Sequence, residues 1–155
     1  MANMADTVTV VTATGEDGTP GGLTVSAFCS VSREPPLVLV SISKDSRTLD
    51  AIESSGMYTV NLLKRGSDDV AMTFAGSSDL KFDGIVARDP GLPGGGPVLA
   101  EASFAYLECE VHSAVEAGDH WVFVGRVVYG EPIVEAHPLI YYRRSFRDLA
   151  QPGGQ

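Results

Sequence analysis

Alternation of hydrophobic and polar residues dominates the chain and predicts a mainly β protein. Three short runs are rich in β-branched residues, which is typical of strands: 7–14, 37–43 and 57–63. Two longer runs, 103–116 and 120–131, are separated only by a short AGD turn and predict a hairpin. Antiparallel strands joined by short turns favour a compact barrel.

The stretch GGLTVSAFCSVS, residues 21–32, has the most regular alternation. Apolar residues occupy one set of alternate positions. Short hydroxyl side chains occupy positions of the other set: Thr24, Ser26, Ser30 and Ser32. This pattern predicts one half-buried strand whose polar face carries small side chains. Such hydroxyls can pair across strands or bond the backbone. They also leave room for a flat, polar-edged ring close to the backbone.

Two short helices are expected between the strands. Residues 46–56 have Ser46 as a possible N-cap and Gly56 as a stop, and residues 68–76 begin with acidic side chains and end on glycine. The Pro- and Gly-rich segment 90–97 predicts a surface loop.

Composition limits the partners and the compartment. The 155 residues suit one domain, 1–155, with a disordered tail at 150–155. The net charge of −9 argues against nucleic acid as the main partner. No apolar run approaches the ~20 residues of a membrane span, and no signal peptide is visible, so the expected location is the cytoplasm. Cys29 and Cys109 fall in strand-like runs and are expected to be reduced, buried thiols.

The segment SISKDSRT, residues 41–48, is the clearest candidate for binding chemistry. It ends a strand and enters a helix through Ser46, Arg47 and Thr48. Free amides and the dipole at a helix N-terminus attract anions, and an adjacent Arg would add charge for a phosphate. A capped helix with a solvated Arg is the more common meaning of such a segment. Together with the hydroxyl row, however, it indicates a nucleotide-like ligand.

Other candidates are less specific. His120 lies where a turn meets a strand, which more often marks a simple polar turn residue. The C-terminal basic cluster of Arg143, Arg144 and Arg147 could hold a phosphate or pair with the abundant acids. No nucleophile constellation, metal-ligand spacing or phosphate-binding glycine loop is found.

The order of five motifs resembles a known family. These segments are TVVTATGEDGTPGGLTVSAFCSVSREPPLVLVSISKDSRTLDAI, YTVNLL, FAGSSDLKF, EAGDHWVFVGRV and PLIYYRRSF. Together they resemble the flavin reductase-like family, the short-chain reductases that partner two-component flavin monooxygenases. The resemblance implies an FMN-binding split β-barrel (Greek-key) with short flanking α-helices, usually a homodimer. It also implies FAD or FMN as the flavin and NADH or NADPH as the co-substrate.

The resemblance further implies roles for individual residues. The isoalloxazine ring would contact Thr24, Val25, Ser26 and Ala27. The ribityl chain and phosphate would contact the SISKDSRT segment through Ser41, Ile42, Ser43, Ser46, Arg47 and Thr48. Further flavin contacts would come from Phe74, Ala75 and Lys81. His120 of the GDH motif would be the catalytic residue beside the nicotinamide, with Tyr142 and Arg147 near it.

The expected function is therefore that of an NAD(P)H:flavin oxidoreductase that supplies reduced flavin to a partner monooxygenase. The flavin supplies the reactivity, so the absence of an acid–base constellation fits this function. The main alternative is a non-catalytic split-barrel protein that binds flavin or another aromatic ligand. A pyridoxamine-phosphate-oxidase-like enzyme and a purely structural β domain are further alternatives.

Overall fold

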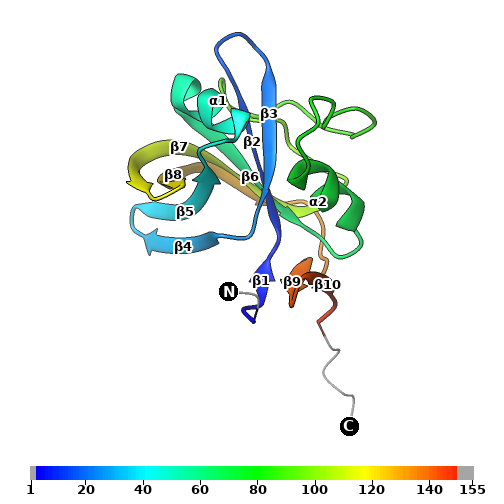
Figure 1. The fold of residues 1–155 in the computed structure, drawn as a ribbon. Helices are drawn as coiled ribbons and strands as arrows, with labels where there is room; N and C mark the ends of the chain where they lie inside the picture. The colour runs from blue at the N-terminus through cyan, green and yellow to red at the C-terminus, as the bar shows by residue number, and fades with distance from the viewer. Residues whose placement is uncertain (1–2, 150–155) are drawn as a thin grey trace.

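The computed structural model describes residues 3–149 and consists mainly of strands in two antiparallel sheets (Figure 1). The larger sheet contains, from one edge to the other, β3 (Pro20–Val25), β2 (Thr9–Thr14), β6 (Met57–Leu63), β7 (Ser103–Ala117), β8 (His120–Pro132), β5 (Pro36–Ser43) and β4 (Phe28–Arg33). The smaller sheet contains β1 (Asp6–Thr7), β9 (Ile140–Tyr142) and β10 (Ser145–Arg147). The helices are α1 (Arg47–Ser55) and α2 (Asp68–Ala75).

The mainly β fold with two short helices is confirmed, and so are the predicted β7–β8 hairpin and both predicted helices. The barrel does not close, because β3 and β4 are the two edges of the large sheet and no ladder joins them within residues 3–149. The small sheet was not predicted as such. The predicted disordered tail at 150–155 lies outside the described residues.

The stretch 21–32 is not one strand, which corrects the sequence-based prediction. The strand breaks at Ser26 and Ala27, so β3 pairs with β2 at one edge while β4 pairs with β5 at the other. The predicted row of hydroxyls is therefore divided between two edges of the sheet. Alternation along a sequence specifies which face a residue takes only while the strand continues.

The two cysteines differ in burial, and for Cys29 the break is the reason. After it, Phe28 packs against the core and Cys29 is exposed, so the prediction of a buried Cys29 thiol is wrong. Cys109 on β7 is fully buried, as predicted, and burial raises the pKa of its thiol to about 12.

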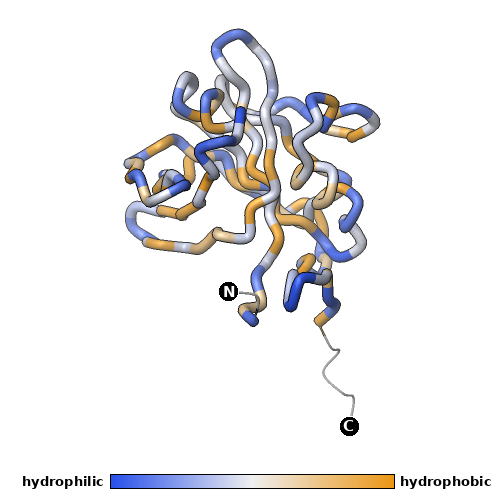
Figure 2. The backbone as a smooth tube through the Cα atoms, viewed as in Figure 1, coloured by the Kyte–Doolittle hydropathy of each residue, from blue (hydrophilic) through white to orange (hydrophobic). Residues whose placement is uncertain are grey.

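Two hydrophobic clusters hold the helices on the sheet. Ile42, Tyr58 and Val60 from the strands pack against Ile52 of α1 in the first, and Phe74 of α2 packs with Val10 and Leu99 in the second; the larger side chains in both are fully buried. Figure 2 shows hydrophobic segments along the strands and hydrophilic colour in the loops between them. As a result, α1 and α2 lie on either side of β3 (Figure 1).

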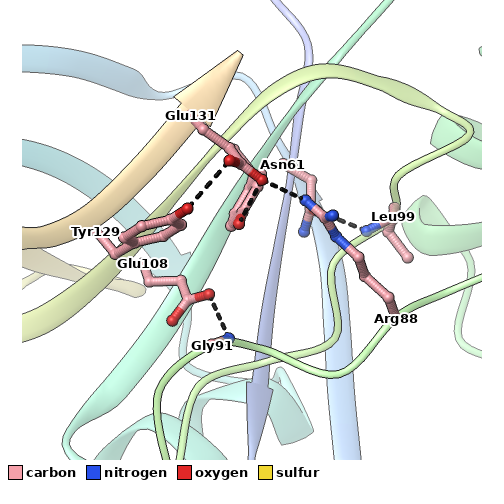
Figure 3. Close-up of polar contacts among 8 residues, drawn as sticks. Asn61, Arg88, Gly91, Leu99, Glu108, Tyr129 and Glu131 are labelled. Carbon is pink, nitrogen blue, oxygen red and sulfur yellow. Dashed lines mark hydrogen bonds and ion pairs between the residues drawn. The ribbon is translucent and has the colours of Figure 1, made fainter. Parts of the chain in front are cut away.

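The connection between α2 and β7, residues 76–102, is fixed by polar contacts (Figure 3). The carboxylate of Glu108, a fully buried residue, accepts hydrogen bonds from the amides of Gly91 and Leu92 at 2.7 and 2.9 Å. Leu99 N donates to the Asn61 side chain at 2.8 Å. A buried carboxylate needs such donors, so these contacts hold the connection tightly to the sheet.

The prediction of a simple surface loop at 90–97 is therefore wrong in part. Gly95 and Gly96 are buried, and a Cβ on Gly96 would lie 2.1 Å from the Thr12 carbonyl carbon. The loop backbone packs directly against β2. Glycine-rich composition predicts a turn, but it does not reveal which surface the turn packs against.

Candidate functional site

A groove of about 830 Å³ lies where the start of α1, strand β3 and the end of α2 meet. Its fourth wall is the beginning of the long connection, residues 76–82. The lining residues fall within three separate stretches of the chain: 15–24, 43–54 and 74–82. Two cationic side chains, Arg47 and Lys81, line it together with five acidic ones: Glu16, Asp17, Asp45, Asp50 and Asp79.

The N-terminus of α1 opens onto this groove. The Ser46 hydroxyl accepts a hydrogen bond from Thr48 N at 3.2 Å, which fixes the first turn, and Gly56 ends the helix in a left-handed conformation. Capping leaves other amides of the first turn without helical acceptors. Because Ser46, Arg47 and Thr48 all line the groove, this end presents N–H donors, hydroxyls and a guanidinium to the same space.

Strand β3 provides a floor of very small residues. A Cβ on Gly21 would lie 3.1 Å from the Thr48 Cα atom, and one on Gly22 would lie 2.5 Å from the Phe74 ring. These glycines allow α1 and the Phe74 ring to approach the strand closely. Phe74 meets Phe82 edge to face at 5.1 Å between ring centroids. Backbone and aromatic surface therefore border the groove beside its polar end.

Lys81 ties two walls of the groove together. Its ammonium group donates to the carbonyls of Gly22 and Phe74 at 3.0 and 3.1 Å. An ammonium has three N–H donors, so one remains for a ligand. Burial lowers the pKa of Lys81, and the charge of nearby Arg47 lowers it further. The two cations are close enough to repel, so an anion placed between them would be favoured.

Arg47 has protein partners in this structure. Its guanidinium forms an ion pair with Asp79 and donates to the Ser77 carbonyl at 3.4 Å. Both charged side chains are exposed, with 64% and 75% of their surface accessible. The pair therefore joins α1 to the opposite wall of the groove across its open side.

Half of the site residues predicted from sequence meet at this groove: Thr24, Ser43, Ser46, Arg47, Thr48, Phe74, Ala75 and Lys81. The Thr24 hydroxyl is already used, because it donates to the Ala71 carbonyl at 2.6 Å and so links β3 to α2. That these residues contact a flavin stays a prediction.

Five other predicted flavin contacts do not line the groove. The side chains of Val25 and Ile42 are buried in the core, so only their backbone groups could meet a ligand. Ser26 and Ala27 form the exposed break between β3 and β4, and Ala27 accepts a bond from Ser41 N at 3.1 Å. Ser26 and Ala27 follow the groove-lining part of β3 along the chain.

His120 lies next to the groove on β8. Its register partner across the sheet is Ser43, which lines the groove. The imidazole Nδ1 lies 2.6 Å from a carboxylate oxygen of Asp119, and this contact lowers the pKa of Asp119. The neighbouring carboxylate orients the imidazole ring.

Tyr142 and Arg147 are not brought to the groove of the same chain. They belong to β9 and β10; β9 pairs with β1, which precedes β2 in the chain, and β10 pairs with β9 (Figure 1). The groove runs along β3 from Pro20 to Thr24, which pair with Thr14 and Val10 of β2. Neither Tyr142 nor Arg147 is among the residues that line it.

Several groove residues were not predicted: Gly21, Gly22, Ser77, Ser78, Asp79 and Phe82. The adjacent glycines in a strand-like run were a usable signal, because glycine inside a strand often marks close backbone approach. Asp79 gave no such signal, since its role depends on an ion pair with a residue far along the chain.

Within residues 3–149, no group of three or more His, Cys, Asp and Glu side chains could hold a metal ion. In the same range, none of the helices has the length and apolar character to cross a membrane.

The fold and the groove define a class: an antiparallel β domain with a cleft between two short helices and an edge strand of small residues. The chain belongs to the flavin reductase-like family, because the model of the flavin reductase like domain matches residues 1–150. This confirms the resemblance of its motifs to that family.

Individual relatives are flavin reductases or reductase components as well. The chain is 46% identical over 140 residues to a flavin reductase (NADH) of Kitasatospora aureofaciens, covering 90% of this chain and 73% of the relative. It is 36% identical over 153 residues to the reductase component of 4-hydroxyphenylacetate 3-monooxygenase from Thermus thermophilus, covering 98% and 94%.

Among solved structures, an NADH:FAD oxidoreductase of Streptomyces globisporus in complex with NAD and FAD fragments has a TM-score of 0.90 and 31% identity. The match covers 99% of this chain and 90% of that one. These matches confirm the fold class and support the predicted NAD(P)H-dependent reduction of flavin.

Proposed function

We propose that this protein is an NAD(P)H:flavin oxidoreductase and that the groove beside α1 holds its flavin. The observation that carries this proposal is the meeting of Arg47, Lys81 and the capped start of α1 around one cleft, beside a glycine floor. In an acidic chain, this is a local site for a phosphorylated ligand.

The residues present fit a flavin in size and in chemistry. A volume of about 830 Å³ lies within the usual range for small-molecule sites. Thr48 and the Phe74 ring pack directly onto Gly21 and Gly22, so these glycines set how closely α1 and α2 approach β3 beside the groove. The donors at Ser46, Arg47 and Thr48 suit the phosphate end.

The chain itself has to bind and orient rather than to supply a nucleophile. When bound, flavin supplies the hydride-accepting chemistry, and reduced nicotinamide is the donor. Groove residues fix the flavin, while His120, held by Asp119 beside Ser43, orients the nicotinamide. His120 is thus assigned as a positioning group near the reacting rings.

The natural acceptor of the reduced flavin is proposed from the relatives. Several are reductase components of two-component monooxygenases, such as that for 4-hydroxyphenylacetate. We infer that this protein also passes reduced flavin to a separate monooxygenase, and that it does so in the cytoplasm.

A homodimer is proposed from an open apolar face. On the side of β4, β5 and β8 turned away from the core lie Cys29, Leu37, Leu39, Val122 and Val124, which we call the open face. Leu39 stands between Cys29 and Val124 in the register, so the three form a continuous strip. A second copy of the chain would cover these aliphatic side chains.

The experiment that tests the function is steady-state oxidation of NADH and NADPH by the purified protein with FMN, with FAD and without flavin. Oxidation that requires flavin is expected. Flavin binding without oxidation of either dinucleotide would instead favour a non-catalytic flavin-binding protein, and His120 would then be only a turn residue.

A further inference from the structure

We propose that Asp79 is an internal competitor of the flavin phosphate: it pairs with the Arg47 guanidinium and is displaced when a phosphate binds. This inference rests on the proposed function, because it takes Arg47 as a phosphate ligand. It assigns to Asp79 a role in selecting and releasing the phosphorylated flavin.

The Asp79 carboxylate and a bound phosphate would compete for the same Arg47 guanidinium. The guanidinium already has the Asp79 carboxylate and the Ser77 carbonyl as acceptors. A guanidinium offers a fork of N–H donors that matches a carboxylate or a phosphate equally well. A phosphate at the start of α1 must therefore replace Asp79 or share the fork with it.

The segment that carries Asp79 is fixed at both ends but exposed between them. Gly76 is bonded to the last turn of α2, and Lys81 is bonded to Gly22 and Phe74. Residues 77–80 are all exposed, and within residues 3–149 their hydrogen bonds and ion pairs to other elements are those with Arg47. Losing the ion pair would free a short segment without disturbing its anchors.

The ion pair is weak enough to exchange. Pairs between exposed side chains contribute little to stability, and here both partners are more than half exposed. A phosphate would gain the same guanidinium, the N–H donors of α1 and the nearby Lys81 ammonium. The exchange therefore favours phosphate when it is present and Asp79 when it leaves.

Competition between Asp79 and the phosphate would help a reductase to release its product, the reduced flavin. A carboxylate that recaptures Arg47 weakens the hold on the phosphate and speeds dissociation of the flavin. Asp79 is then expected to keep flavin affinity moderate, and to act only on flavins that carry a phosphate.

The test compares Asp79→Asn with Asp45→Asn. Both residues line the groove and each change removes one negative charge, but Asp45 forms no ion pair within residues 3–149. Dissociation constants and dissociation rates are measured for FMN and for riboflavin, which has the same ring without phosphate. Asp79→Asn should tighten FMN binding about three- to fivefold, mainly through slower dissociation, and leave riboflavin unchanged. Asp45→Asn should change FMN binding by less than that.

Equal effects of the two variants on FMN, or no tightening by Asp79→Asn, would overturn the competition. Arg47→Met separates this outcome from failure of the proposed site. If Arg47→Met weakens FMN but not riboflavin, the phosphate site stands and only the role of Asp79 is lost. If Arg47→Met leaves FMN binding unchanged, the phosphate is not at Arg47, and both the placement and the competition are wrong.

Discussion

Among single residues of the core, Tyr58 packs closely against the glycine at position 125. Its hydroxyl is buried beside the Cys109 thiol without a hydrogen-bond partner of good geometry, and burial raises the pKa of both groups. A Cβ on Gly125 would lie 2.0 Å from this hydroxyl. Gly125 is therefore required by the close approach of the Tyr58 side chain.

Gly125→Ala should lower the free energy of unfolding by about 3 kcal/mol, because the tyrosine has no space to move in a close-packed core. Tyr58→Phe added to it should recover about 1 kcal/mol, since it removes the nearest atom, although the ring carbon at 2.7 Å remains. Urea denaturation measures both. Gly76→Ala, where a Cβ meets nothing closer than 3.4 Å, is the control. No loss of stability in Gly125→Ala would contradict this packing.

His120→Ala should raise the KM for NADH about tenfold and weaken flavin binding much less. The reason is that His120 borders the groove at Ser43 rather than lining it. Steady-state kinetics and flavin titration give the two values. His112→Ala, on an exposed part of β7, is the control. Equal losses in both values, or no change in either, would count against the positioning role.

At the scale of elements, the β9–β10 hairpin is closed by two arginines in an unusual conformation. Arg143 and Arg144 have φ values of 49° and 61°, and they join the paired residues Tyr142 and Ser145. Two-residue hairpin turns with positive φ strongly favour Asn-Gly. The turn is thus built from residues that adopt its backbone at a cost.

Arg143→Asn combined with Arg144→Gly should raise the free energy of unfolding by about 1 kcal/mol. Thermal and urea denaturation measure the change. The control is Arg147→Asn with its neighbour unchanged, because Arg147 lies in β10 and its replacement relieves no turn. A destabilised double variant would show that the arginines contribute contacts that outweigh the strain of the turn.

The elements also show how far the sequence could predict this structure. Local signals sufficed for α1, because Ser46 and Gly56 cap it within the chain, and for the β7–β8 hairpin, because its turn is short. They failed at Ser26, where one alternating run changes from one sheet edge to the other. That change depends on strands β2 and β5, which lie elsewhere in the sequence.

One part of the candidate site could be predicted from local sequence, and another part could not. The start of α1 was predictable as an anion site from its own residues, whereas the opposite wall at 76–82 was not predictable from local pattern. Its position is set by Lys81 bonding to Gly22 and by Asp79 pairing with Arg47, both of which are long-range contacts.

At the scale of the whole molecule, a charged substitution on the open face tests whether the protein is a dimer. Val124→Arg would place a charge among Cys29, Leu39 and their apolar neighbours. We expect the unaltered protein to be a dimer in light scattering after size exclusion, and Val124→Arg to be a monomer. Val86→Arg, at an exposed loop position, is the control. A monomeric unaltered protein, or a dimeric Val124→Arg variant, would contradict the proposed interface.

If the groove beside α1 holds the flavin that NADH reduces, loss of the Lys81 ammonium must raise the concentration of FMN that this reduction requires. The test is anaerobic mixing of NADH with protein and FMN, following the loss of flavin absorbance, for the unaltered protein, Lys81→Met and the control Lys64→Met. We expect Lys81→Met to need about tenfold more FMN to reach a similar limiting rate, and Lys64→Met to behave like the unaltered protein. If flavin is not reduced at all, or if Lys81→Met has the same dependence on FMN as the unaltered protein, the groove is not the site of flavin reduction.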